Sequence, residues 1–160
     1  MGCNRRSAGG RVRAVFGPGS GLPRGRIDAM QKRTLRPLCD RISRERIRVV
    51  IHDFYERLRA DAQLSHVFAH IEDFSAHEAR IADFWFTAMG GRLESPPQVD
   101  MVGKHFPLGI RDADMDRWLE LFRETAVDHL DLDLAQQWIF MAEGIAGRLR
   151  QIVVHHKISG

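Results

Sequence analysis

The sequence has few cysteines and no long apolar run, and both absences exclude classes of protein. Cys3 and Cys39 are the only cysteines among 160 residues, which is too few for a disulfide framework or a cysteine-rich metal site. No apolar run is long enough to cross a bilayer, and the pair Arg5-Arg6 is not followed by the apolar stretch of a secretory signal. We therefore expect a cytoplasmic protein without a membrane partner.

The sequence also lacks the motifs of several enzyme and cofactor classes. It contains no His-Glu-x-x-His of a zinc hydrolase, no Cys-x-x-Cys-His that would attach a c-type haem, and no serine nucleophile elbow. It has no glycine-rich phosphate loop and no flavin or nicotinamide motif, so any redox reaction would need an external electron donor. No segment alternates apolar and polar residues over the length of a strand. We therefore predict an all-α fold.

Basic charge is concentrated at the front of the chain. The formal net charge is +3, yet the excess of arginine lies in residues 1–46 and the remainder is close to neutral or acidic. Residues 1–40 are rich in Arg, Gly, Pro and Ser, a composition that cannot bury enough apolar area to offset the entropy of ordering. We predict a disordered extension over residues 1–40, a folded domain over 41–154 and a polar tail over 155–160.

Most of the remaining sequence consists of apolar stripes with helical spacing. The stripes begin at Ser43, at Ser75, after the acidic turn 111–114 and at Leu134. Ser75 and Glu78 have the spacing of a capping box, which predicts that the second helix starts there, and Gly90-Gly91 predicts its end. Residues 62–74 predict an irregular or 3₁₀ connector with Phe68 as its anchor.

His105 lies on an apolar face directly before a helix breaker. Met101, Val102 and His105 share one face of a short helical segment, and Pro107 cannot continue that segment. A helix this short is marginal unless packing or another bond stabilises it, and a metal ligand would supply such a bond. The alternative is a core or surface histidine that only caps a turn.

His77 lies on the same helical face as the bulkiest apolar residues of the chain. Ile81, Phe84 and Trp85 follow it at spacings of four, seven and eight residues. Two lone histidines on apolar faces of an all-helical, aromatic-rich domain suit a flat apolar cofactor gripped between helices. One histidine would bind its iron, and the opposite face would be left for a gas.

The residues that surround these histidines occur in a familiar order. They are Phe54-Tyr55, Phe68, His77 with Ile81, Phe84 and Trp85, Lys104-His105, and the run Arg-Trp-Leu-Glu-Leu-Phe at 117–122. With this order and spacing, residues 47–153 resemble the truncated haemoglobins, specifically their third group. The long Arg/Gly-rich front end and the short, glycine-containing loop between His105 and Trp118 depart from the family pattern.

The resemblance implies a two-over-two helical sandwich that binds a b-type haem, with His105 as the ligand of the iron. The implied ligand-stabilising residues on the distal side are Tyr55, His77 and Trp118. The implied cofactor-binding residues, besides His105 itself, are Phe54, Phe68, Ile81 and Trp85 in the pocket walls, with Arg80 and Lys104 for the haem propionates.

Two classes of function remain open at this point. The first is a haem protein that binds dioxygen, nitric oxide or carbon monoxide, with Tyr55 and Trp118 donating hydrogen bonds to bound dioxygen. Slow oxygen release would favour nitric oxide oxidation or peroxide chemistry, with an external reductant, over oxygen transport. The second is a non-haem helical interaction module or a nucleic-acid-binding module that uses the basic front end. Because that front end lacks interleaved aromatic residues, we expect no nucleic acid partner.

Overall fold

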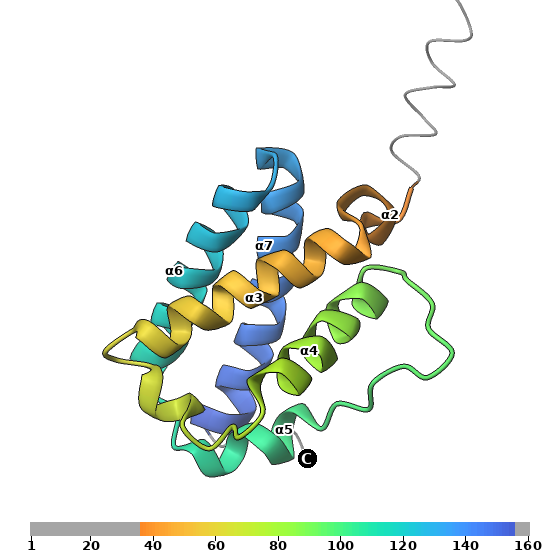
Figure 1. The fold of residues 1–160 in the computed structure, drawn as a ribbon. Coiled ribbons are helices and arrows are strands. Elements are labelled where there is room, and N and C mark those ends of the chain that lie inside the picture. Colours follow the sequence, from red (N-terminus) through yellow and green to blue (C-terminus); the bar gives the residue numbers. More distant parts are fainter. Residues whose placement is uncertain (1–35, 156–160) are drawn as a thin grey trace, which may run out of the picture. The chain divides into compact units, whose positions relative to one another are not determined.

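Residues 36–155 are described by a computed structural model, and within that range the chain is helical and has no strand (Figure 1). The elements in order are α2 (Leu38–Ile42), α3 (Arg44–Ala60), η1 (Ser65–Phe68), α4 (Phe74–Ala88), α5 (Met101–His105), η2 (Phe106–Leu108), α6 (Asp112–His129), α7 (Leu132–Leu149) and η3 (Arg150–Val154). Within the described range, no helix is long and apolar enough to span a bilayer. The predicted all-α class is confirmed.

The four long helices form two pairs. α3 packs on α4, α6 packs on α7, and α3 also crosses α6, so that one pair lies over the other (Figure 1). This is the two-over-two sandwich that the family resemblance implied.

Aromatic rings fill the place where the two pairs meet. Phe122 of α6 is fully buried and contacts the rings of Phe54, Trp85 and Trp138 at centroid distances of 5.2, 6.0 and 5.4 Å. These rings come from all four long helices. Burying a large apolar side chain contributes roughly 1.5–3 kcal/mol, so this cluster fixes how the pairs cross.

The end of α5 and the start of α4 show how well local sequence signals predicted the helix boundaries. α5 ends at His105 before Pro107, as predicted, and Asp100 caps its start by accepting a hydrogen bond from the Gly103 N–H at 2.8 Å. The predicted N-cap of α4 at Ser75 was wrong by two residues. Asp73 is the N-cap, because its carboxylate accepts the Ala76 N–H at 3.0 Å. The helix therefore begins at Phe74, and Ser75 already lies within its first turn.

The connector and the loop after α5 position the remaining elements. A 3₁₀ turn, η1, occupies the predicted connector. Leu64 and Val67 are more deeply buried there than the predicted anchor Phe68, which packs at the edge of the core. After η2, Gly109 adopts a left-handed conformation with φ of 62°, which favours glycine and redirects the chain into α6.

The folded part begins before the predicted boundary at residue 41. α2 starts at Leu38 and buries Cys39, whose backbone N–H donates to the Met89 carbonyl at 3.3 Å. The boundary therefore falls inside a helix. At the other end, His155 lies 3.0 Å from an Asp112 carboxylate oxygen. Residues 1–35 and 156–160 lie outside the described part. The disorder predicted over residues 1–35, the polar tail beyond His155 and most of the basic arm on which the non-haem alternative rests fall there, whereas the disorder predicted over residues 36–40 is wrong where α2 begins at Leu38.

A buried carboxylate holds the first turn of α6. Asp114 is 2% exposed and accepts hydrogen bonds from the side chain and backbone N–H of Arg111 and from Gln63, all at 3.0 Å. The Arg111 hydrogen bonds are the largest of the effects that lower the pKa of Asp114, to about 2.

Stability should fall in acid because of this group. A carboxyl whose folded pKa lies below its unfolded value stabilises the fold above the unfolded pKa, and that contribution is lost as pH falls toward the folded pKa. We expect a loss on the order of 1–2 kcal/mol between pH 4 and pH 2, measured by urea unfolding across that range. Asp114→Asn should flatten this dependence, whereas Glu124→Gln, on the exposed side of the same helix, should not. Equal pH profiles for the wild type and Asp114→Asn would contradict this assignment.

Candidate functional site

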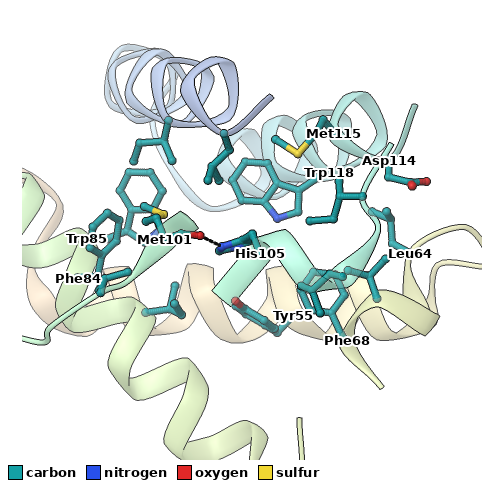
Figure 2. A pocket seen from close by; sticks show the side chains of 17 residues that line it. Tyr55, Leu64, Phe68, Phe84, Trp85, Met101, His105, Asp114, Met115 and Trp118 are labelled. Atoms are coloured by element: carbon teal, nitrogen blue, oxygen red, sulfur yellow. Dashed lines mark hydrogen bonds between the residues drawn. The ribbon is translucent and has the colours of Figure 1, made fainter. Parts of the chain in front are cut away.

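An apolar pocket lies between the helix pairs and is lined by α3, η1, α4, α5, α6, α7 and the loops around η2 (Figure 2). Its walls are Tyr55, Leu64, Val67, Phe68, Ile81, Phe84, Trp85, Val99, Met101, His105, Leu108, Ile110, Asp114, Met115, Trp118, Ile145 and Leu149. The empty space, including the part open to solvent, is about 890 Å³. Asp114 is the only carboxylate among these residues. Apolar walls that carry only a few polar groups suit a small organic molecule or an organic cofactor.

His105 enters the pocket from the end of α5. Its Nδ1 lies 2.5 Å from the Met101 carbonyl oxygen, one turn earlier in the same helix (Figure 2). Because a carbonyl can only accept, Nδ1 carries the hydrogen, and Nε2 keeps its lone pair. A carbonyl on Nδ1 is also the usual way in which proteins fix the tautomer and orientation of a metal-ligating histidine. The His105 ring is thus prepared to bind a metal through Nε2.

A hydrogen-bonded pair joins α3 to α4 beside the pocket. The Tyr55 hydroxyl oxygen lies 2.9 Å from His77 Nε2, and the two rings meet edge to face with centroids 5.1 Å apart. Tyr55 lines the pocket, whereas His77 is half-buried behind it and reaches the pocket only through Tyr55.

Both members of this pair are neutral near pH 7. Burial raises the pKa of the Tyr55 hydroxyl. Burial, together with the nearby positive charge of Arg80, lowers the pKa of His77. The pair therefore offers the pocket a neutral hydroxyl whose hydrogen can be donated to His77 or to a ligand.

Trp118 provides a second polar hydrogen from α6. Its ring stacks on Phe122 with centroids 5.7 Å apart and an angle of 6° between the planes, and meets Phe54 edge-on at 5.3 Å. Figure 2 shows its indole nitrogen on the edge of the ring that faces His105 and Tyr55. Within the described part of the chain, no hydrogen-bond acceptor meets this N–H.

The other predicted site residues divide into three groups. Phe68, Ile81 and Trp85 line the pocket. Phe54 lies behind the lining and supports the rings of Tyr55 and Trp118. Arg80 and Lys104 are exposed, lie outside the lining, and form no ion pair with any described residue.

Eleven of the seventeen lining residues were not among the site residues that the sequence predicted. Val99 and Ile110 come from irregular segments before α5 and after η2, Leu108 comes from η2 itself, and Ile145 and Leu149 come from the last turns of α7. Ile145 and Leu149 belong to the apolar stripe that begins at Leu134, but a stripe does not reveal which neighbouring helix it faces. For the loop residues, only their apolar character in otherwise polar segments gave a signal.

The sequence matches the family model described as bacterial-like globin over residues 38–143. The chain belongs to the bacterial-like globins. The fold of this globin is also similar to the crystal structure of the 2/2 haemoglobin from Synechococcus sp. PCC 7002 in the cyanomet state with covalently attached haem. The TM-score is 0.63 at 21% identity, over 75% of this chain and 99% of that one. A comparison with curated proteins gave no match.

Membership of the globin family implies haem binding, and the site of this globin fits that cofactor. The pocket walls are apolar apart from a few groups, and His105 Nε2 has no hydrogen-bond partner among the described residues. Arg80 and Lys104 are left without partners among the described residues, so both are available to carboxylates. These are the groups that a flat apolar ring with an iron centre and acidic side chains requires.

Proposed function

We propose that this globin holds a b-type haem in the pocket through His105 and binds diatomic gases on the side of Tyr55 and Trp118. The haem would supply an iron atom with one coordination position open to dioxygen, nitric oxide or carbon monoxide. The observation that carries the proposal is the hydrogen bond between His105 Nδ1 and the Met101 carbonyl, because it leaves Nε2 free inside an apolar pocket.

The residues of the chain would hold the cofactor in three ways. The Met101 carbonyl would keep the His105 ring oriented and increase the basicity of its Nε2. Phe68, Ile81 and Trp85 would pack against the flat faces of the macrocycle and exclude water. Arg80 and Lys104 would pair with the propionates at the pocket edge.

The distal donors favour a polar ligand. The Tyr55 hydroxyl and the Trp118 indole N–H would both donate hydrogen bonds to bound dioxygen, because dioxygen would carry partial negative charge when bound. Carbon monoxide would carry much less charge and would accept much weaker hydrogen bonds. Dioxygen should therefore be released slowly. Slow release favours a chemical reaction of dioxygen over its transport. In one such reaction, nitric oxide, dioxygen and one electron from an external donor would give nitrate. Peroxide chemistry would need a reductant in the same way.

A hemin titration tests the proposal. Adding hemin to the full-length protein should produce an intense Soret band that saturates at one haem per chain. Saturation should also raise the melting temperature, because a ligand that binds only the folded state adds on the order of 4 kcal/mol at a thousandfold excess over its Kd. A protein that stays colourless and melts at the same temperature with and without hemin would refute haem binding.

A further inference from the structure

The beginning of α6 is tied to the end of α3 by two partly buried polar links. Arg117 Nε donates to Asp61 Oδ2 at 2.8 Å, and Gln63 Nε2 donates to Asp114 Oδ1 at 3.0 Å. The Asp61 side chain is 9% exposed and that of Asp114 is 2% exposed. Both carboxylates are therefore shielded from water, although the Arg117 side chain is 34% exposed. Hydrogen bonds to charged groups are stronger where water is excluded.

Asp61 has two separate tasks, one for each carboxylate oxygen. Oδ1 accepts the backbone N–H groups of Gln63 at 3.0 Å and Leu64 at 3.1 Å, which fixes the turn that ends α3. Oδ2 accepts the Arg117 guanidinium. One side chain thus connects the geometry of the α3 exit to the first turns of α6.

The tie lies close to both distal donors. Tyr55 lies six residues before Asp61 on α3, and Trp118 is the neighbour of Arg117 on α6. Farther along the crossing, α3 and α6 meet through the rings of Phe54 and Phe122. Ring contacts tolerate sliding, whereas a charged hydrogen bond is directional, so the link from Asp61 to Arg117 defines the separation of the helix ends that carry the donors.

We propose that Asp61 is a positioning residue that acts through Arg117 to set where Trp118 lies relative to Tyr55. It thereby tunes how strongly the pocket retains a polar diatomic ligand. This inference rests on the proposed function for its consequence, but its structural part can be tested without haem.

Asp61→Asn separates the two tasks of this side chain. The asparagine oxygen can still accept the N–H groups of the turn, while its NH₂ replaces the oxygen that faced Arg117 and opposes one donor with another. Arg117→Gln breaks the same link from the other side, together with the 3.0 Å pair between Arg117 and Glu120, and leaves the turn unchanged. The control is Glu143→Gln, which removes the 2.8 Å ion pair between Arg123 of α6 and Glu143 of α7. Neither of these residues lines the pocket.

The first measurement is ¹⁹F NMR of full-length protein labelled with 5-fluorotryptophan. The chain has three tryptophans, and Trp118→Phe assigns the signal of interest. Asp61→Asn and Arg117→Gln should each shift or broaden the Trp118 signal and leave those of Trp85 and Trp138 in place, and Glu143→Gln should move none. A Trp118 signal that neither link variant changes overturns the proposal, whether or not the protein binds haem.

The second measurement is ligand release from the haem-loaded protein. Asp61→Asn should release dioxygen at least about threefold faster, with carbon monoxide release unchanged, and this effect should vanish in the Trp118→Phe background because the two residues act through one network. Equal acceleration in both backgrounds would show that Asp61 does not act through Trp118. Normal haem binding with an unaltered oxygen rate would overturn the tuning role while leaving the proposed function intact.

Discussion

Replacing His105 with alanine should abolish stable haem binding. His105 is the only pocket residue among those described that presents an unprotonated ring nitrogen, and the Met101 carbonyl already holds its other nitrogen. Without it, the apolar walls would retain the macrocycle only by packing, with no bond from the protein to the iron. A hemin titration of both proteins, followed by transfer of haem to an excess of an apo-globin acceptor, measures the loss.

His70→Ala is the matched control for this prediction. His70 Nδ1 also lies within hydrogen-bond distance of a backbone carbonyl, that of Val67 at 3.0 Å, but its ring does not line the pocket. The control should retain haem like the wild type. Added imidazole should partly restore the spectrum of His105→Ala by occupying the space of the lost ring. Haem retention by His105→Ala with an unchanged ferrous spectrum would show that another group binds the iron.

The residues that sequence reasoning located best are those whose signal is local. His105 before Pro107 predicted the end of α5, and the apolar spacing after His77 predicted the face of α4 that carries Ile81 and Trp85 toward the pocket. Each of these depends on residues within two helical turns. The start of α4 was misplaced because Asp73 and Ser75 are both good N-caps, and only the three-dimensional path of the connector decides between them.

The polar links of the site could not be predicted in this way. Arg117 and Asp61 are 56 residues apart in sequence, and Gln63 and Asp114 are 51 apart. Charged residues are common on helix surfaces, so nothing in the sequence distinguishes these from the exposed pair of Arg123 and Glu143. Their partial burial follows from how α3 crosses α6. That crossing is fixed by aromatic rings elsewhere along the two helices, such as those of Phe54 and Phe122.

The pairing of Tyr55 with His77 also joins residues that are distant in sequence, 22 positions apart, and it affects ligand release. The hydroxyl that would serve a bound gas already has a neighbour 2.9 Å away. If His77 Nε2 carries the hydrogen, the imidazole donates to the hydroxyl oxygen and the Tyr55 hydrogen is free for the ligand. If Nδ1 carries it, the ligand and His77 compete for that hydrogen. Trp118 has no such competitor among the described residues, so the two donors should contribute unequally.

Removing both distal donors should accelerate dioxygen release strongly while leaving carbon monoxide release nearly unchanged. Tyr55→Phe removes only the hydroxyl, and Trp118→Phe removes the indole N–H while keeping a ring to stack on Phe122. A hydrogen bond to a charge-bearing acceptor contributes ~1.5–3 kcal/mol, which corresponds to roughly ten- to a hundredfold in rate. Either single change can be partly compensated by the remaining donor, so the effects of the singles should not add up to that of the double.

Stopped-flow measurement of the wild type, both single variants and the double variant gives the complete cycle. Carbon monoxide release serves as the internal control, because a change in the shape of the pocket would alter the release rates of both gases. If Trp118 is the donor without a competitor, Trp118→Phe should be the more damaging single change. A double variant that releases dioxygen as slowly as the wild type would exclude a distal hydrogen-bond mechanism, since no donor of the proposed pair would remain in the pocket.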